Sequence, residues 1–455
     1  MDHQDQNPGI VWFRRDLRLS DNPAWAAATA RHERVVALFV LEPELLRAAG
    51  PIRRAQLFAH LHALDQNLRR DGGGLTIRSG PASGVIETVV SETGAPCVYV
   101  NAGVSRYARS RDATVIDRSP VPIQSFHGCY VNPPGSVLTK KGTVSKVFAP
   151  FFNTWRETPL EPWPVAGKGA PLALPGEEIS AGEVEPFNEP GEDAAYERAC
   201  RWLEVVDAYD ESRDHAAVDG TSGLSTDLKF GTLSARTLME MVGTATPGRA
   251  AFVRQLAWRD WWAHTLHSTP SLVSSALKPA YNNIEWRDDR DGFERWCSGL
   301  TGYPIVDAGM RQLAATGWMH NRVRMICASF LVKDLLIDWR WGERFLRYHL
   351  VDSDISQNAG NWQWVAGTGP DAAPYFRIMN PTTQAKRIDP RGDYIRKWVP
   401  ELAELSAPAV HEPAAAGAGV LEAAGVALDD TYPGPMLDHG EARIRTLAAY
   451  KAAVG

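Results

Sequence analysis

The sequence has few of the features that place a protein in a membrane, in a secretory route or around a structural metal. Its 455 residues include only five cysteines, with no C-x-x-C pair: Cys97, Cys129, Cys200, Cys297 and Cys327. Cysteines this far apart predict free thiols rather than a disulfide, zinc or iron–sulfur site. No apolar run approaches the roughly 20 residues of a membrane helix, and the first residues do not resemble a secretory signal. We therefore expect a cytoplasmic protein with no membrane partner and no metal.

An excess of positive charge is also lacking. Lys and Arg number 48 against 54 Asp and Glu, for a formal net charge of −6. This excludes a protein coated in positive charge, but a nucleic-acid-binding protein needs only a local basic face. By count, residues 318–400 hold twelve Lys or Arg and eight Asp or Glu. That local excess suggests such a face, with a solvated helical surface as the alternative.

Tryptophan, by contrast, is abundant. The chain has 16 tryptophans, and by count eleven of them fall between Trp258 and Trp398. Walls for a flat ligand, stacking platforms for bases or an electron-transfer chain would each use such rings. Composition alone leaves core packing as an equal alternative.

The pattern of apolar residues predicts an α/β part followed by a helical part. Runs at 10–13, 35–41, 75–77 and 97–100 indicate buried strands separated by helical patterns. Strands that alternate with helices imply a parallel sheet. Residues 160–190 are rich in proline and glycine, and from about 191 the periodicity is helical.

We therefore predict three parts. They are an α/β N-terminal domain with a parallel Rossmann-like sheet at 1–135, an interdomain connector at 136–195, and an all-α C-terminal domain at 196–455. No internal repeat is visible.

Hydroxyl-rich segments near the start of the helical part suit a phosphate group. They are 221–225, of sequence TSGLS, and 230–234, of sequence FGTLS, which leads into a helix. Hydroxyls and free backbone N–H groups at a helix start can bind phosphate or pyrophosphate. Ser234 is read equally well as a plain helix N-cap, so the pattern alone leaves both readings open.

The segment 252–262 places polar side chains beside indoles on one helix. At helical spacing Gln255 and Trp258 share a face, as do Arg259 and Trp262. Such a helix surface can bind a flat heterocycle, with the polar side chain at the edge of the ring and the indole against its plane. An amphipathic helix with its aromatic rings in the core is the alternative.

Two more segments combine polar and aromatic residues. In 318–325, Asn321, Arg324 and Met325 project to one side, whereas His320 by itself is more often a packing histidine. The segment 352–364 holds two carboxylates, several amides, a glycine and two indoles. Because a loop without function seldom contains two tryptophans, this segment predicts a site.

Together these segments resemble the photolyase/cryptochrome family, and within it the class I cyclobutane pyrimidine dimer photolyases. The resemblance covers nearly the whole chain, and co-linear motifs of this length are specific. The motifs that carry it are WFRRDLR at 12–18, TSGLS at 221–225, TGYPIVD at 301–307, GWMHNR at 317–322 and YFRIMNP at 375–381, with Asp21-Asn22, Tyr432-Pro433 and Asp438-His439.

The resemblance implies that the helical domain binds FAD and DNA and is catalytic. Asn358 would face flavin N5, because an amide can hydrogen-bond that atom in either protonation state. An arginine near the ring would offset the charge of a reduced, anionic flavin. The other implied FAD neighbours are Tyr209, Thr221, Ser222, Leu224, Ser225, Arg259, Arg324, Asp352 and Asp354.

The resemblance also implies a carbon–carbon lyase that repairs cyclobutane pyrimidine dimers in UV-damaged DNA by blue light. The dimer would be flipped out of the duplex into a pocket, where Trp258 and Trp364 wedge it. Electron transfer from excited reduced FAD would open the ring, so positioning and electrostatics are the work of the protein. The remaining implied residues are Gln255, Asn321 and Met325 in the pocket, and Arg213, Arg322 and Arg377 on the DNA. We expect a monomer that needs no protein partner.

Three tryptophans match the family's electron-transfer chain, which reduces oxidised flavin from the surface. Trp362 would lie nearest the flavin, Trp339 next and Trp286 outermost. Simple packing is the alternative for Trp339, which stands in an apolar helix.

One residue departs from the class I pattern. Gln255 occupies a position where those enzymes usually carry a glutamate that hydrogen-bonds the dimer. An amide can donate a hydrogen bond but supplies no proton. Photolyases for (6-4) lesions and animal cryptochromes have glutamine there, but the (6-4) enzymes carry pocket histidines where this chain has Asn321 and Met325. We therefore keep the cyclobutane-dimer interpretation and expect an altered repair yield.

Other functions stay open at this stage. A blue-light-receptor cryptochrome is the main alternative, although the matching segments reach nearly to residue 450 and leave no long signalling tail. A flavin-free nucleic-acid-binding module would purify colourless, and a scaffold without a site would require every match to be a coincidence.

The resemblance leaves the antenna chromophore weakly specified. Folate-binding members carry a histidine and an Asn-Glu pair where this chain has Ala48, Tyr107 and Ala108. A deazaflavin (8-HDF) is favoured over a folate (MTHF), because Arg53 matches a contact of that subclass. The acidic partners of a deazaflavin are replaced here by Gly103 and Ser105.

Overall fold

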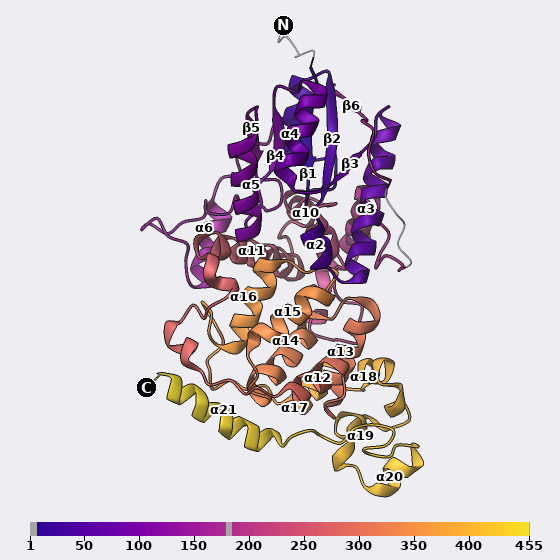
Figure 1. Cartoon of the computed structure of the whole chain (residues 1–455). Helices are drawn as coiled ribbons and strands as arrows, with labels where there is room; N and C mark the ends of the chain where they lie inside the picture. The colour runs from indigo at the N-terminus through magenta and orange to yellow at the C-terminus, as the bar shows by residue number, and fades with distance from the viewer. Residues whose placement is uncertain (1–6, 179–183, 455) are drawn as a thin grey trace. The chain divides into compact units, whose positions relative to one another are not determined.

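The computed structural model describes residues 7–178 and 184–454 (Figure 1). They form two compact units: unit 1 is Met1–Asp207 with Ser222–Pro270, and unit 2 is Ala208–Thr221 with Ser271–Gly455. Residues 1–6, where no secretory signal was expected, and 179–183 of the predicted connector lie outside the described residues. The domain boundaries that we drew from the sequence stay a prediction.

Unit 1 is built on a parallel sheet of six strands in the order β3-β2-β1-β4-β5, with β6 paired to β2. Ile10 lies opposite both Val36 and Val98 in the register. In this order the chain runs from β1 outward to β2 and β3 and then crosses to β4 and β5, so the winding of the sheet reverses between β1 and β4. The strands are β1 (Gly9–Phe13), β2 (Arg34–Leu41), β3 (Thr76–Ser79), β4 (Val98–Asn101), β5 (Ile123–Phe126) and β6 (Ala170–Leu172).

Both faces of this sheet are covered, as continuous apolar strands require. Ile10 and Trp12 of β1 belong to an apolar cluster with Ile86 of α4 (Ala82–Thr93) and Val115 of α5 (Arg106–Arg118). On the opposite face, Phe13 contacts Trp25 of α1 (Pro23–Arg31) with ring centroids 5.9 Å apart. The sequence pattern is thus confirmed as a doubly wound α/β fold.

Two further strands escaped the sequence pattern. β5 is only half-buried and carries polar Gln124 and Ser125, whereas β6 is three residues long and contains Pro171. Neither has the apolar run that marks a buried strand. The other helices of unit 1 are α2 (Pro43–Arg47), α3 (Pro51–Arg70), α6 (Phe148–Glu157), α7 (Glu192–Leu203), α9 (Ser225–Phe230), α10 (Ala235–Val242) and α11 (Pro247–Ser268).

The regular elements in the described residues of unit 2 are helices, as the sequence predicted, apart from an isolated β-bridge between Leu428 and Tyr432. A single π-helical turn, Phe330–Asp334, follows α14. The helices are α8 (Tyr209–Ser212), α12 (Arg290–Ser298), α13 (Pro304–Thr316), α14 (Asn321–Ser329), α15 (Trp339–His349), α16 (Ile355–Ala366), α17 (Pro381–Ile388), α18 (Asp393–Trp398), α19 (Ala407–His411), α20 (Ala418–Ala423) and α21 (His439–Val454). Short 3-10 turns occur at Val206–Ala208, Pro270–Val273, Pro279–Asn283, Pro400–Leu402 and Pro413–Ala415.

Buried polar anchors fix the long loops of unit 2. The carboxylate of Asp307, 0% exposed, accepts from the backbone N–H groups of Thr301 and Gly302 and from the Tyr432 hydroxyl. The last helix is held by its Tyr450 hydroxyl, which donates to the Ala366 carbonyl at 2.7 Å. Within the described ranges no helix is both long and apolar enough to cross a bilayer.

Candidate active site

Three of the predicted site residues in unit 1, Gln255, Trp258 and Arg259, lie on α11. The ring of Trp258 stacks on Phe148 of α6, with centroids 3.7 Å apart and planes 10° from parallel. The Gln255 amide donates to the Ala251 carbonyl of its own helix at 3.2 Å. Trp258 and Gln255 are both half-buried, so each keeps surface on which a ligand could rest.

Arg259 is held by groups of the protein itself, and its contact with FAD stays a prediction. Its guanidinium donates to the carbonyl groups of Cys129 and Leu228 at 2.7 and 2.9 Å, and lies 4.6 Å from the Tyr130 ring. Its neighbour Asp260 accepts from the Trp155 indole and from the Asn132 backbone. These contacts fix α11 against the segment that precedes α6. Burial raises the pKa of Asp260 to about 6.

The hydroxyl-rich segment leads into α9. Ser222 accepts from the Leu224 backbone at 3.3 Å, and Gly223 takes a left-handed φ of +65°. The Thr226 hydroxyl and Asp227 Oδ2 are buried and have no hydrogen-bond partner in the described parts of the chain. The division between the units falls between Thr221 and Ser222. Ser234, by contrast, is the N-cap of α10, so its plainer reading is confirmed.

In unit 2, Arg324 of α14 and Asp352 form a bidentate ion pair. The two N–O distances are 3.1 and 2.9 Å, and Arg324 Nε donates to the Met319 carbonyl at 2.6 Å. Asp352 is 5% exposed and Arg324 is 24% exposed. Fork-shaped pairing of this kind fixes the plane of the guanidinium. The cation is therefore held in place while part of it stays accessible.

Asp354 and Asn358 mark the start of α16. Asp354 is the N-cap and accepts from the backbone of Ser356 and Gln357. The Asn358 amide nitrogen donates to the carbonyl and carboxylate of Glu343, both at 2.9 Å. With the nitrogen committed, the amide oxygen of Asn358 remains as an acceptor.

Glu343 was missed by sequence reasoning. It lies on α15, is 3% exposed, and burial raises its pKa. A signal was present, because Glu343 is next to Gly342 on a helix whose buried face also holds Trp339 and Leu346. A carboxylate on such a buried face needs a hydrogen-bonding or ionic partner.

The predicted DNA and pocket residues of α14 lie close together. Asn321 is exposed, and its amide lies 4.0 Å from Met325 Sδ. Arg322 pairs with Asp214 at 2.6 Å to both oxygens. Burial acts to raise the pKa of Asp214, but the hydrogen bond and charge of Arg322 lower it overall. Arg322 therefore offers only part of its charge to a phosphate.

The remaining predicted residues of unit 2 are accessible to different degrees. Arg213 lies 5.7 Å from the Tyr209 ring, Arg377 is exposed, and Trp364 is half-buried. His320 caps α14 by accepting from the Arg322 backbone. Its Nε2 is buried and has no hydrogen-bond partner among the described residues, and burial lowers its pKa to about 4.

The three tryptophans of the predicted chain belong to one apolar cluster of unit 2. Trp362 and Trp339 are 2% and 1% exposed, and Trp286 packs against the same cluster. A Cβ atom at Gly342 would come within 2.2 Å of the Trp362 ring, so glycine is needed there. Trp362 also makes an edge contact with Trp296 at 6.3 Å, which the sequence did not reveal.

Comparison with known proteins identifies this architecture. The family model described as DNA photolyase matches residues 9–168, and that of the FAD binding domain of DNA photolyase matches residues 252–452. The deoxyribodipyrimidine photo-lyase of Streptomyces griseus is 42% identical over 456 residues, covering 96% of this chain and 97% of the relative. That of Agrobacterium fabrum is 39% identical and covers 98% of each.

The chain belongs to the DNA photolyase family. Among solved structures, a class III photolyase from Agrobacterium tumefaciens matches with a TM-score of 0.92 and 37% identity, covering 99% of this chain and 98% of the other. A Synechocystis cryptochrome matches with a TM-score of 0.87 and 27% identity, covering 99% and 100%. The predicted family, fold class and FAD cofactor are confirmed, whereas class I stays a prediction.

The residues of this photolyase's unit 2 fit an FAD. They supply a fixed cation in Arg324, an acceptor oxygen in Asn358 and a buried ring nitrogen in His320 that lacks a partner within the described segments. These donors and acceptors suit the edge of a flavin, which carries carbonyl oxygens and an N–H or bare nitrogen at N5. No group of three or more His, Cys, Asp or Glu in the described residues could hold a metal ion.

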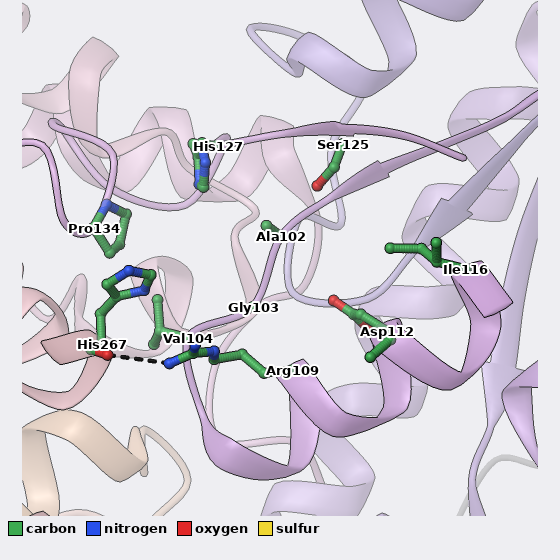
Figure 2. A pocket seen from close by; sticks show the side chains of 11 residues that line it. Ala102, Gly103, Val104, Arg109, Asp112, Ile116, Ser125, His127, Pro134 and His267 are labelled. Atoms are coloured by element: carbon green, nitrogen blue, oxygen red, sulfur yellow. Dashed lines mark hydrogen bonds between the residues drawn. The ribbon is translucent and has the colours of Figure 1, made fainter. Parts of the chain in front are cut away.

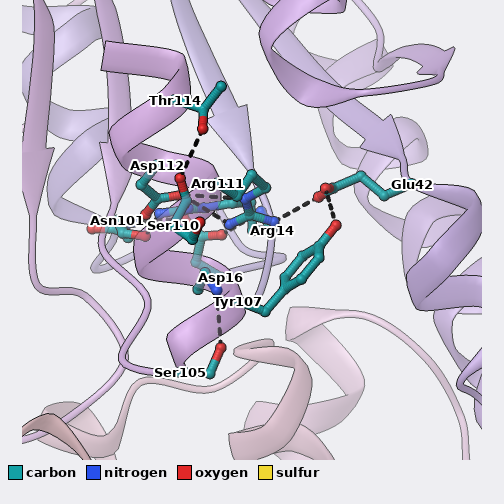
Figure 3. Close-up of polar contacts among 11 residues, drawn as sticks. Arg14, Asp16, Glu42, Asn101, Ser105, Tyr107, Ser110, Arg111, Asp112 and Thr114 are labelled. Carbon is teal, nitrogen blue, oxygen red and sulfur yellow. Dashed lines mark hydrogen bonds and ion pairs between the residues drawn. The ribbon is translucent and has the colours of Figure 1, made fainter. Parts of the chain in front are cut away.

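The strand ends of unit 1, where a doubly wound sheet places a ligand, are filled by the chain's own side chains (Figure 3). Arg14 pairs with Asp112 at 2.6 Å, and Arg111 pairs with Glu42 at 2.6 Å. The Tyr107 hydroxyl donates to the other Glu42 oxygen at 2.6 Å. Burial and the adjoining Glu42 carboxylate raise the pKa of Tyr107 to about 12.

Open space in unit 1 lies on another side of α5. A pocket of about 280 Å³ lies there, and the Arg109 guanidinium in its lining donates to the His267 carbonyl at 3.1 Å. Figure 2 shows its lining side chains. Gly103, one of the replaced antenna positions, lines this pocket, whereas Ser105 is the N-cap of α5. Arg53 donates to the Ala48 carbonyl at 2.6 Å.

Proposed function

We propose that this chain is a deoxyribodipyrimidine photo-lyase that repairs cyclobutane pyrimidine dimers in DNA under blue light. The observation that carries the proposal is full-length identity of about 40% to curated enzymes of that name, together with polar groups of unit 2 that suit a flavin. Reduced FAD, when bound, supplies the excited electron that opens the cyclobutane ring and accepts it back afterwards.

The residues of unit 2 hold the flavin and set its electrostatics. Arg324, fixed by Asp352, balances negative charge on the reduced ring. Asn358, oriented by Glu343, presents its oxygen to the ring edge and can accept a hydrogen bond there. Asp354 begins α16 and so sets the position of Asn358 one turn later. The remaining proposed contacts are Tyr209, Thr221, Ser222, Leu224, Ser225 and Arg259.

The substrate is held by aromatic and amide groups. We assign the two indoles Trp258 and Trp364 to the faces of the flipped dimer, and Asn321, Met325 and Gln255 to its edges. Their half-buried or exposed state supports this assignment. The Gln255 amide can give the dimer a hydrogen bond, and no proton transfer is needed for the two C–C bonds to break. Arg213, Arg322 and Arg377 bind the flanking phosphates.

Photoreduction of oxidised flavin uses Trp362, Trp339 and Trp286 in that order outward. Their place in one apolar cluster supports this role. A monomer in the cytoplasm without a required protein partner, with the domain boundaries predicted above, completes the proposal.

We assign 8-HDF rather than MTHF as the antenna, because Ala48, Tyr107 and Ala108 replace the folate-binding residues. The contacts of Tyr107 and Arg111 with Glu42 fill the sheet crevice, so a deazaflavin seated there displaces at least one of them. The measurement is absorbance after reconstitution with each chromophore. Uptake of MTHF alone contradicts the assignment.

A second function is favoured by one residue. Gln255 is the residue found at this position in (6-4) photolyases and animal cryptochromes, and the Synechocystis cryptochrome shares the fold. A single experiment separates these functions: an oligonucleotide with one thymine cyclobutane dimer is illuminated with the pre-reduced protein. Restored thymine absorbance in light and none in darkness supports dimer repair. Normal flavin photoreduction without restored thymine contradicts it and leads to a (6-4) substrate or a signalling partner.

A further inference from the structure

One stretch of unit 1 combines exposed positive charge with a complete lack of carboxylates. No Asp or Glu occurs between Asp117 and Glu157, although the net charge of the chain is −6. Lys140, Lys141 and Lys146 are exposed, and their ammonium groups form no ion pair within the described ranges. Lysines isolated from acidic residues in an acidic protein are typical of a surface that meets a polyanion.

These lysines stand on a preformed turn, Thr139–Lys146, which we call the basic turn. The Thr139 N–H donates to the Thr143 carbonyl at 2.8 Å, and the Gly142 N–H donates to the Thr139 carbonyl at 2.9 Å. Gly142 takes a φ of +72°, a conformation that glycine adopts without strain. The turn is therefore closed by its own backbone, and its lysine side chains are left for solvent or a partner.

The end of the basic turn is fixed to the face of α11 that carries Trp258. The Trp261 indole N–H donates to the Ser145 carbonyl at 2.8 Å. Phe148, which follows the turn, is 1% exposed and stacks on Trp258. Phe148 also meets the Trp261 ring edge-on at 5.8 Å. Ser145 and Phe148 are thus both fixed to α11, and Lys146 lies between them.

Phe148 covers one face of the Trp258 ring, and the half-buried Trp258 keeps part of its surface accessible to a base. The Arg254 guanidinium lies 4.9 Å from the rings of Phe148 and Phe152. Arg254 is itself exposed. Aromatic platforms flanked by cations are the pattern by which proteins bind nucleic acid without reading its sequence.

We propose that the basic turn Thr139–Lys146 binds the DNA backbone, and that Phe148 is a positioning residue that fixes Trp258 beside it. The lysines of the basic turn then bind phosphates near the lesion, while the accessible part of Trp258 contacts the dimer. Ammonium groups bind phosphate without sequence preference, which suits a lesion that forms between adjacent pyrimidines whatever the flanking sequence. The inference rests on the proposed function, because it assumes that Trp258 meets damaged DNA.

The first test measures the salt dependence of binding to a labelled oligonucleotide that contains one dimer. In the K140A/K141A/K146A protein, three lost phosphate contacts should reduce the slope of log Kd against log salt by up to about 2.7. Kd at 0.1 M salt should rise roughly 10- to 100-fold. The charge-preserving K140R/K141R/K146R protein should bind like the wild type. An unchanged slope in the alanine protein, even with weaker binding, overturns the proposal.

A matched control removes one exposed lysine from elsewhere in unit 1. Lys168 lies next to Gly169, whose N–H donates to the Thr29 carbonyl at the end of α1. Lys168→Ala should leave the slope unchanged, whereas each single lysine-to-alanine change in the basic turn should lower it by up to about 0.9. An equal effect of Lys168→Ala means that net charge alone is responsible, and the proposal fails.

Phe148→Leu tests the positioning role, since leucine fills the buried space but cannot stack. At saturating DNA the repair rate should fall several-fold, while the salt slope and the flavin content stay close to wild type and the melting temperature falls by only about 2–4 °C. An unchanged repair rate overturns the positioning role. If the wild type repairs no dimer, the proposed function fails; if it repairs dimers but the basic-turn variant keeps its salt slope, only the present inference fails.

Discussion

Two clusters of side chains in this molecule contain the same arginine and carboxylate groups but use them for different purposes. In unit 1, Arg14, Arg111 and Tyr107 direct their donors at Asp112 and Glu42, which fill the crevice at the strand ends. In unit 2, the Arg324–Asp352 and Asn358–Glu343 pairs use only part of each group's bonding capacity.

The two clusters differ in the polar atoms that they leave without a hydrogen-bond partner. Buried polar groups need partners, and the crevice of unit 1 provides its own. The Asn358 oxygen and His320 Nε2 in unit 2 are placed by neighbours that bind their other atoms. A side-chain pair whose donors all bind within the protein is structural. A pair that orients an atom without a hydrogen-bond partner prepares a site for a ligand. Changes in the second cluster should therefore affect flavin and repair, and changes in the first should affect stability.

The largest expected effect is that of Arg324→Met. It removes the cation proposed for the flavin and leaves Asp352, 5% exposed, without its partner. Loss of one member of a buried pair costs about 3 kcal/mol or more of stability. We expect flavin absorbance to be lost on gel filtration and repair to fall at least 100-fold. Arg311→Met, which breaks the pair with Glu401 in the same unit, should keep its flavin. Retention of flavin by the Arg324 variant would contradict the comparison.

Outside this crevice, unit 1 also contains buried polar atoms without a hydrogen-bond partner among the described residues, and the pH dependence of stability can test one of them. Asp227 is 0% exposed and its Oδ2 lacks a hydrogen-bond partner in the described residues; burial raises its pKa to about 6. The folded chain therefore holds more protons than the unfolded chain between about pH 4 and 6. The free energy of unfolding should fall across that window by about 2–3 kcal/mol from this group and level off above it. Urea unfolding of wild type and Asp227→Asn from pH 4 to 7 measures this.

Other buried groups titrate in both proteins: the pKa of Asp260 is raised to about 6, and the pKa values of His60 and His264 are lowered to about 3. The slope of the wild type minus that of Asp227→Asn therefore isolates Asp227, and this difference should be negative between about pH 4 and 6. Equal slopes in both proteins would mean that Asp227 ionises normally.

A smaller effect is expected in the crevice of unit 1. Tyr107→Phe removes one hydrogen bond to Glu42 and should lower the free energy of unfolding by about 1 kcal/mol. Flavin content and dimer repair should not change, because the crevice satisfies itself. Chemical denaturation together with a repair assay checks both expectations. Lost repair at unchanged stability would show that this crevice serves catalysis.

The sequence predicted whole elements better than it predicted the partners of side chains. The strands at 10–13 and 35–41 were visible because both faces of a parallel strand are buried, whereas β6 was hidden by its length and Pro171. Asn358 was found by resemblance. The apolar face of α15 offered a signal for Glu343, but its pairing with Asn358 depends on how α15 packs on α16 and is not visible in the sequence. Likewise nothing in the spacing of Phe148 and Trp258 reveals that their rings stack.

The smallest expected effect is that of Gln255→Glu, which restores the glutamate usual in class I enzymes. Gln255 is half-buried, and its nitrogen donates to its own helix at Ala251. A protonated carboxyl donates an O–H group, which forms shorter hydrogen bonds than an amide N–H, so the repair yield per absorbed photon should rise, by no more than about twofold. The helix and the stack on Trp258 do not depend on this side chain, so affinity and stability should stay unchanged. A lower yield in the glutamate variant would indicate that the pocket is matched to the amide, and would move the substrate assignment toward the (6-4) lesion.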